Sequence, residues 1–342
     1  MRRSGFLMLI MCTALAAAGC AGGESAGEST ASGNPMEQTV LSTENSREAR
    51  PLTTETQAEE TGGPGHAWAI NPDGTTLESR LPAPEGFSRV HQEEGSFGSF
   101  VRNFSLLPDG EPVHLYDGRL KGNQEAAAAV FAMPVLESGD VQQCADSVMR
   151  MYAEYFWHSG QPEKIGFHFV NGFWFDYPTY RDGGRVKVNG NSVSWSQSAS
   201  YDDSYEAFER YLFIAFSYSS TLSMWEESRP ADIGDVQIGD VFLRGGSPGH
   251  VVMVADVCED GQGRKAFLLA QSYMPAQQFH VLNNPLHRED PWYYVDEVSY
   301  PFATPEYRFD EGSFRRMNYL DGGARPHRGR ACRQGAGVGP WR

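Results

Sequence analysis

The clearest periodic pattern in the chain begins near residue 141. Apolar residues recur there at intervals of three and four, which is typical of an amphipathic helix. They are Ala145, Val148, Met151, Tyr152, Tyr155 and Phe156. Asp140 lies before this run and Gln143 follows it by three residues, a spacing that approximates a capping box and predicts Asp140 as the N-cap. Cys144 is therefore expected in the first turn of a long helix.

Short apolar runs in the second half of the chain predict β-strands. They cover residues 240–243, 250–257, 266–271 and 279–282. Residues 259–263, with the sequence EDGQG, form a turn signal between the second and third runs. Because such short connections join antiparallel neighbours, we expect an antiparallel meander.

Further elements are expected before the meander. Short strands are predicted within residues 87–106 and 165–170, and a second amphipathic helix over about 203–225. The Asn189-Gly190 pair between alternating residues predicts a β-hairpin. Together the patterns predict one α+β domain over residues 75–319, in which the helix that carries Cys144 packs on an antiparallel β-meander.

The two ends of the chain have a different composition. Residues 1–20 contain two arginines, an apolar run too short to span a bilayer, and small residues before Cys20. This pattern is typical of a secretory signal, and its Ala-Ala-Gly-Cys ending resembles a lipobox, so we expect lipid on Cys20, with plain secretion as the alternative. Residues 21–66, rich in Gly, Ser, Thr and Glu, predict a flexible tether. Residues 320–342 predict a loose basic tail.

Charge and apolar content restrict the partners that we expect. The formal net charge is −16, which would repel nucleic-acid backbones and anionic lipid head groups over most of the surface. No later segment is long and apolar enough to cross a bilayer, so attachment to a membrane is expected through lipid alone. The aromatic content of 12% predicts a substantial core. We expect a monomer that binds no nucleic acid.

The cysteines leave one thiol unpaired. The chain has 5 cysteines, of which Cys12 would leave with the signal and Cys20 would carry lipid. Of the three that remain, Cys258 and Cys332 are the candidate disulfide pair in an oxidising compartment, which would leave Cys144 reduced. No C-x-x-C or H-E-x-x-H spacing is present, so we expect neither a metal nor another cofactor.

Cys144 is a candidate nucleophile because the amino end of a helix favours a thiolate. His250 starts a predicted strand after a glycine-rich loop and is the candidate general base. Gln271 ends the next predicted strand and could orient the imidazole, while Gln143 or the Cys144 backbone N–H could stabilise an oxyanion. The alternative is structural, because a cysteine on the apolar side of a helix is usually a small core residue.

Two further groups have both a functional and a structural interpretation. Asp146 and Arg150 are four residues apart and could clamp a substrate or form an ion pair within the helix. Trp174 belongs to an aromatic group that could form the base of a groove for a glycan or peptide. The alternative is that these side chains fill the core. The group consists of Phe173, Trp174, Phe175, Tyr177 and Tyr180.

The order of these segments resembles known families. QCADSVMRMYAEYF, IGDVFLRGGSPGHVVMVADV and AFLLAQS are similar to the papain-like cysteine peptidases of the NlpC/P60 and CHAP type. That resemblance implies a papain-like fold with Cys144 as nucleophile, His250 as base and Gln271 as the orienting residue. The residues on both sides of the nucleophile differ from the usual family motif. Those families usually have Asp-Cys-Ser-Gly, and this chain has Gln-Cys-Ala-Asp.

A second resemblance covers more of the chain. GFSRV, SFGSFVRNFSLLPDG, VHLYDG and the two segments around Cys144 and His250 resemble the bacterial lipoprotein family called domain of unknown function 4846. The sequence thus leads to two hypotheses. The first is an exported, membrane-anchored or periplasmic lipoprotein that hydrolyses amide bonds of cell-envelope peptides through a Cys-His-polar triad. The second is a non-catalytic envelope lipoprotein that binds a peptide, glycan or partner protein in the same cleft.

Overall fold

The computed structural model describes residues 70–137 and 139–321. The predicted signal, the tether, Cys20 and Cys332 lie outside these residues, as does nearly all of the predicted basic tail. The Cys258–Cys332 disulfide therefore stays a prediction. Within the described residues, no helix is long and apolar enough to cross a membrane.

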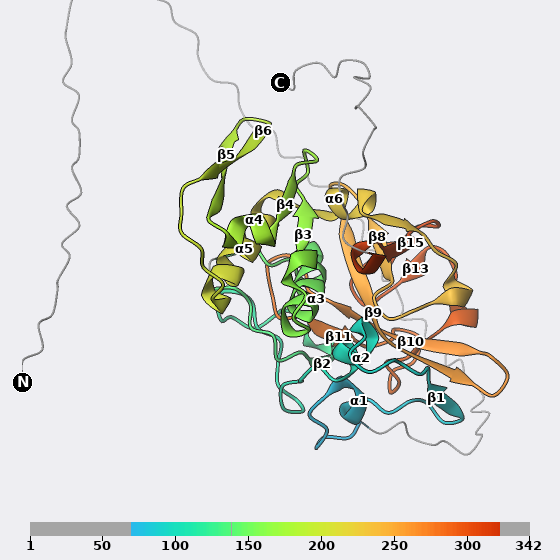
Figure 1. The fold of residues 1–342 in the computed structure, drawn as a ribbon. Helices are drawn as coiled ribbons and strands as arrows, with labels where there is room; N and C mark the ends of the chain where they lie inside the picture. The colour runs from blue at the N-terminus through green and yellow to red at the C-terminus, as the bar shows by residue number, and fades with distance from the viewer. Residues whose placement is uncertain (1–69, 138, 322–342) are drawn as a thin grey trace, which may run out of the picture. The chain divides into compact units, whose positions relative to one another are not determined.

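A nine-stranded antiparallel sheet forms the centre of the described domain (Figure 1). Along its main path the order is β2-β11-β10-β9-β8-β15-β7, while β1 pairs with β9 and β12 pairs with β10. The strands are β1 (Phe87–Arg89), β2 (Ala127–Val130), β7 (Ser228–Pro230), β8 (Val241–Arg244), β9 (His250–Asp260), β10 (Lys265–Gln271), β11 (His280–Leu282), β12 (Tyr293–Tyr294) and β15 (Phe314–Met317). Since β8, β9, β10 and β11 are consecutive antiparallel neighbours, the predicted meander is confirmed.

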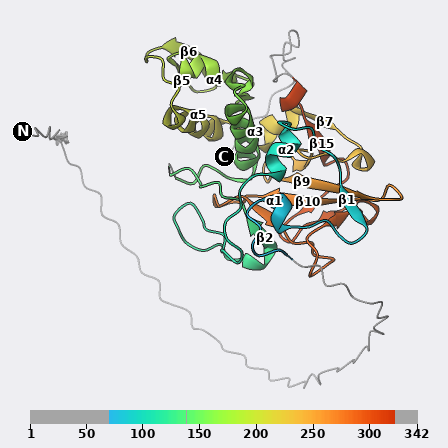
Figure 2. The same ribbon diagram turned by 60° about the horizontal axis from the view of Figure 1, so that its bottom comes forward.

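Helix α3 packs against the middle of this sheet. The helices are α1 (Leu77–Arg80), α2 (Phe97–Arg102), α3 (Cys144–His158), α4 (Tyr177–Arg181), α5 (Tyr205–Tyr218) and α6 (Thr221–Glu226). Helix α3 is buried over most of its length and contacts β9 and α2, beside which it lies in Figure 2. The mixed helix and antiparallel-sheet class predicted from the sequence is confirmed.

Three two-stranded sheets complete the domain. They are β3 (Gly166–His168) with β4 (Trp174–Asp176), β5 (Gly184–Asn189) with β6 (Ser192–Gln197), and β13 (Phe302–Ala303) with β14 (Arg308–Phe309). The β5–β6 hairpin confirms the prediction from Asn189-Gly190, and Gly190 has the positive φ of +58° that its tight turn requires. In both views this hairpin lies with α4 and α5, and α3 lies between them and the sheet.

Three local predictions were wrong. The N-cap of α3 is Gln143, because the Asp140 carboxylate accepts hydrogen bonds from Ala276 N and Gln143 Nε2 and not from the first turn of the helix. The helix expected over 203–225 is divided into α5 and α6, since Ser220 leaves the helical conformation and caps α6. Part of the 87–106 region, expected as strand, forms α2 instead, which Ser96 caps.

A register shift in β9 separates the two ends of that strand. Asp256 is paired with Leu268 of β10, whereas Val254 is paired with Leu269. Consecutive residues of β10 point to opposite faces of the sheet, so Asp256 and Val254 also point to opposite faces. Between His250 and Val254, β9 pairs with β8 without a shift, so these two residues, four positions apart, point to the same face. His250 and Asp256 therefore lie on opposite faces.

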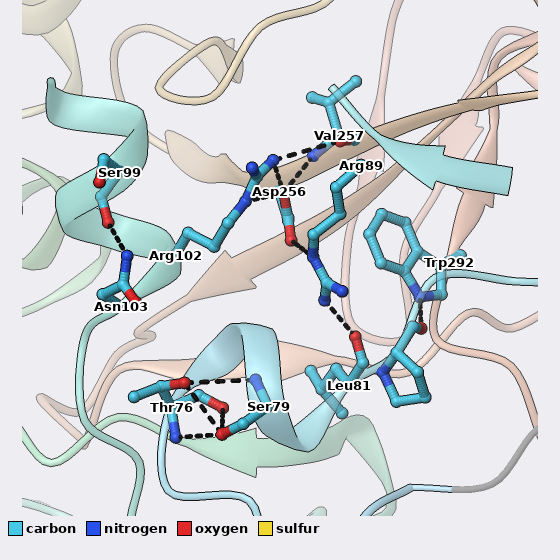
Figure 3. Close-up of polar contacts among 11 residues, drawn as sticks. Thr76, Ser79, Leu81, Arg89, Ser99, Arg102, Asn103, Asp256, Val257 and Trp292 are labelled. Atoms are coloured by element: carbon cyan, nitrogen blue, oxygen red, sulfur yellow. Dashed lines mark hydrogen bonds and ion pairs between the residues drawn. The ribbon is translucent and has the colours of Figure 1, made fainter. Parts of the chain in front are cut away.

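Asp256 forms a buried ion cluster on its face of the sheet (Figure 3). Its carboxylate accepts from Arg102 of α2 at 2.6 Å and from Arg89 of β1 at 2.6 Å, and it is completely buried. Arg89 also donates to the carbonyl of Leu81, and its guanidinium lies over the Trp292 ring. The cluster joins segments far apart in the sequence and fixes α2 on the sheet.

We expect Asp256→Asn to lower the free energy of unfolding by about 3–5 kcal/mol, because two arginines would lose a buried counter-charge. Urea unfolding followed by circular dichroism would measure this. The control is Asp117→Asn, which removes a carboxylate paired with the exposed Arg119 and should leave the urea midpoint almost unchanged. Equal midpoints for wild type and Asp256→Asn would contradict a stabilising role of the cluster.

Candidate functional site

The structure brings Cys144 and His250 to the same cleft. Cys144 is the first residue of α3 and His250 is the first residue of β9. Both line a cavity of about 780 Å³, together with Gln143, Asp146 and residues of the neighbouring loops. Their separation of 106 positions in the sequence is thus no obstacle, because the first residues of α3 and β9 line the same cavity.

The Cys144 thiol is held by backbone groups. Backbone N–H groups of Val251 and Ala145 interact with its sulfur atom, and Val251 directly follows His250. The side chain is partly buried and packs against the hydrophobic core. The nucleophile predicted from the sequence therefore lies next to the backbone of the residue that follows the predicted base.

His250 is held by a hydrogen bond and by aromatic rings. Its Nε2 lies 2.9 Å from Oε1 of Gln271, the last residue of β10, and both side chains are at least 98% buried. The rings of Tyr273 and Tyr307 have their centroids 4.6 and 4.7 Å from that of the imidazole. The structure therefore brings the predicted orienting residue, Gln271, into hydrogen-bond contact with the His250 ring.

The electrostatics of the site differ from the sequence expectation. Burial, and secondarily the charge of Asp146, raises the pKa of the Cys144 thiol to about 12. The expectation of a lowered thiol pKa was wrong, because desolvation of the sulfur outweighs the helix terminus. Burial also lowers the pKa of His250 to about 4, against the smaller opposite effect of the Gln271 hydrogen bond. At neutral pH both groups are therefore uncharged.

Asp146 lies at the cleft as a helix-capping residue. Its Oδ2 accepts from the backbone N–H of Gln143 at 2.9 Å, whereas its buried Oδ1 has no hydrogen-bond partner among the described residues. Burial raises the pKa of this carboxyl to about 8. Asp146 is therefore mainly protonated at neutral pH, and its charge appears only as the pH passes about 8.

The structure does not bring Arg150 or Trp174 to this cleft. Arg150 is buried further along α3, where it donates to Glu154 and to the Gln142 side chain, so neither the substrate clamp nor an ion pair with Asp146 is formed. Trp174 of β4 packs beside His168. Its neighbours Phe175, Tyr177 and Tyr180 are buried in the core, in agreement with the structural interpretation of that aromatic group.

The two candidates for the oxyanion site differ in availability. The Gln143 side chain lines the cleft, but its Nε2 donates to the Asp140 carboxylate at 3.1 Å. The Cys144 backbone N–H is in the first turn of α3, where amides have no acceptor within the helix. The backbone amide is therefore the better placed of the two for a developing negative charge.

Two tyrosines at the site were missed by sequence reasoning. Tyr273 follows β10 by two residues, a position next to Gln271 that could have drawn attention to it. Tyr307 belongs to the turn between β13 and β14 and has no local sequence signal. In the part of the chain that the structure describes, no three His, Cys, Asp or Glu side chains gather as a metal site requires.

These features define the class of protein as an α+β domain in which a thiol and an imidazole line one cleft and a buried amide is hydrogen-bonded to the imidazole. The family described as domain of unknown function (4846) matches residues 77–316, and the chain belongs to this family. The match includes Cys144, His250 and Gln271. Comparisons with curated proteins and with solved structures found no match.

We expect the rate of Cys144 alkylation by iodoacetamide to rise about tenfold per pH unit from pH 6 to 8, because only the thiolate reacts. Above about pH 8 the rise should flatten, since ionised Asp146 then disfavours the thiolate. Asp146→Asn should react like wild type below pH 8 and faster above it. Mass spectrometry of the peptide that contains Cys144 measures the rate.

The control for this measurement, made on reduced protein, is the thiol of Cys258, which is buried on β9 and does not line the cleft. Its alkylation should not respond to Asp146→Asn. A rate for Cys144 that is already at its plateau at pH 7 would contradict the neutral thiol, and equal rates for both proteins at pH 9.5 would contradict the influence of Asp146.

Proposed function

We propose that this protein is a papain-like cysteine hydrolase that cleaves amide bonds of cell-envelope peptides. The observation that carries the proposal is that Cys144 and His250 line one cleft, with the His250 imidazole hydrogen-bonded through Nε2 to the buried amide of Gln271. The fold supports it as well, because a helix that begins with the nucleophile packs on an antiparallel sheet that carries the base.

In the acylation step, His250 takes the proton of the Cys144 thiol through Nδ1 as the sulfur attacks the carbonyl carbon of the amide. Because both groups are uncharged beforehand, proton transfer accompanies formation of the C–S bond. The Cys144 backbone N–H stabilises the oxyanion. The imidazolium then protonates the leaving nitrogen, the C–N bond breaks, and an acyl-thioester remains on Cys144.

In the deacylation step, a water molecule attacks the thioester while His250 accepts one of its protons. The C–S bond breaks, and the proton returns to the sulfur as the carboxylic acid product leaves. Gln271 takes no proton in either step. Its Oε1 accepts a hydrogen bond from Nε2 and keeps Nδ1 directed at the reacting groups.

The second candidate function is a binding protein that uses the same cleft for an envelope peptide, glycan or partner protein. The observation that favours it is the uncharged state of the pair, since a thiol with a pKa of about 12 beside an imidazole with a pKa of about 4 is a weak nucleophile before substrate enters. The two functions differ in whether a bond is broken.

Cleavage of purified peptidoglycan stem peptides, followed by mass spectrometry, tests the proposal. We expect Cys144→Ala and His250→Ala each to lower kcat at least about 100-fold, and the double variant to be no worse, because the two residues act on one proton. Gln271→Ala should cost less, since it orients the ring only. Cys258→Ala is the matched control and should keep full activity.

Equal cleavage by wild type and Cys144→Ala would contradict the hydrolase. If wild type binds stem peptides without cleaving them, and calorimetry shows that Tyr273→Ala weakens this binding, the binding function is supported and the hydrolase is contradicted. Tyr273 suits this purpose because it lines the cleft and takes no part in the proposed proton transfers.

For location, we propose export and anchoring in the cell membrane through lipid on Cys20, supported by the small residues that precede this cysteine. We expect Cys20→Ala to move the protein from the detergent phase to the aqueous phase in phase partitioning of producing cells. Cys12→Ala, within the predicted signal, is the control and should leave partitioning unchanged. A Cys20→Ala protein that stays in the detergent phase would contradict the anchor.

A further inference from the structure

We infer that Glu306 is a positioning residue that sets the protonated nitrogen of His250 by fixing the orientation of the Gln271 amide. Glu306 lies in the turn between β13 and β14, outside the motifs that the sequence singled out. The inference deepens the proposed function, but its main test needs no substrate and no turnover.

Glu306 stands between Gln271 and a lysine. Its Oε2 accepts from Gln271 Nε2 at 2.7 Å, and its Oε1 accepts from Lys121 Nζ at 2.5 Å. The Lys121 side chain is 5% exposed and that of Glu306 is 16% exposed, so solvent competes little for these contacts. A continuous chain of hydrogen bonds thus runs from Lys121 through Glu306 and Gln271 to His250.

The direction of this chain follows from which groups can donate. An ammonium group only donates and a carboxylate only accepts, so Gln271 must present its NH₂ to Glu306. Its Oε1 then faces His250, and because this oxygen only accepts, Nε2 of His250 must carry the hydrogen. A neutral imidazole has a single N–H, which leaves Nδ1 with the free lone pair that a general base needs.

Without the carboxylate the orientation of the amide would be undetermined. The oxygen and nitrogen of a glutamine side chain occupy nearly the same space, so a half-turn of the amide changes no packing and reverses every hydrogen bond. With the NH₂ facing His250, Nε2 would have to accept and Nδ1 would carry the hydrogen. The imidazole would then keep its position and lose its function as a base.

The turn that carries Glu306 is itself fixed. The backbone N–H of Tyr307 donates to Thr304 Oγ1 at 3.1 Å, and that of Thr304 donates to the Tyr307 carbonyl at 2.9 Å. The ring of Tyr307 packs on His250. One short turn thus supplies both the ring that packs on the imidazole and the carboxylate that orients its partner.

Glu306→Gln provides a sharp test because Lys121 remains in place. The ammonium group of Lys121 can only donate, so the side-chain oxygen of the glutamine at position 306 faces Lys121 and its NH₂ faces Gln271. Gln271 must then turn its own oxygen away from His250, and the hydrogen moves from Nε2 to Nδ1. In Lys121→Met the carboxylate stays and the wild-type orientation is kept. In the Lys121→Met/Glu306→Gln double variant the ammonium is gone. The Asn123 amide, which also contacts Oε1 of Glu306 at 3.3 Å, can present either its NH₂ or its oxygen, so the wild-type orientation can return.

The measurement is long-range ¹H–¹⁵N correlation NMR of the full chain labelled with ¹⁵N-histidine, with the His250 signals assigned by their loss in His250→Gln. We expect hydrogen on Nε2 in wild type and Lys121→Met, on Nδ1 in Glu306→Gln, and mainly on Nε2 again in the double variant. Glu297→Gln, a partly exposed carboxylate paired with His287, is the matched control and should leave His250 unchanged.

A merely structural role for Glu306 makes a different prediction. Both single variants would lower the thermal midpoint, the double variant would be the least stable, and Nε2 would carry the hydrogen throughout. That pattern would overturn the inference.

Stem-peptide cleavage separates this inference from the proposed function. If both hold, kcat falls roughly 100-fold in Glu306→Gln, with KM little changed, and recovers in the double variant. If the hydrogen moves as expected but wild type cleaves nothing, the Glu306 assignment stands and the hydrolase fails. If wild type cleaves and the hydrogen does not move, the hydrolase stands and the Glu306 assignment fails.

Discussion

The register shift within β9 is the constraint on which both halves of the domain depend. In a regular strand, His250 and Asp256 would lie on the same face, because they are an even number of residues apart. The shift turns Asp256 to the face where Arg102 and Arg89 neutralise it, and leaves His250 on the other face beside Tyr307. One additional residue in one strand thus allows a structural ion cluster and a candidate chemical site to share β9.

The same burial that assembles the site also determines its electrostatics. The start of α3 meets the start of β9, and the two tyrosine rings enclose the imidazole. Desolvation then favours the neutral form of both the thiol and the imidazole, so a catalytic role must rely on proton transfer during attack and not on a preformed ion pair. The helix terminus still contributes, through the first-turn backbone N–H groups of Cys144 and Ala145 that interact with the sulfur atom.

The family match assigns no function, so the chemistry of the cleft follows from the side chains that surround it. Cys144 of α3 and His250 of β9 line it, Gln271 of β10 contacts the imidazole, and Glu306 of the β13–β14 turn contacts the Gln271 amide. Among the described residues, no lysine or arginine lines this cleft, whereas Asp140 and Asp146 do. The cleft therefore presents uncharged and acidic groups, which favour amide or cationic groups of a ligand over strongly anionic ones.

The sequence by itself determined those features that rest on local patterns. The helical spacing after Cys144 predicted the helix. The apolar runs at His250 and before Gln271, joined by the turn at residues 259–263, predicted adjacent antiparallel strands, and Asn189-Gly190 predicted a hairpin. Each of these signals acts over a few residues, where side-chain periodicity and turn geometry dominate. Even the meeting of Cys144 and His250 could be anticipated, from the order of their segments.

The tertiary structure decided what depends on contacts between distant segments. Whether the Cys144 thiol is charged depends on its burial against β9, which outweighs the helix terminus that the sequence displays. Arg150 donates hydrogen bonds to Glu154 and Gln142, and the Asp140 carboxylate accepts one from the backbone of Ala276. Residue spacing alone does not reveal these partners, because folding brings them together. Glu306 and Tyr307 could not be connected to His250 from the sequence, since only the folding of the β13–β14 turn over the sheet brings them there.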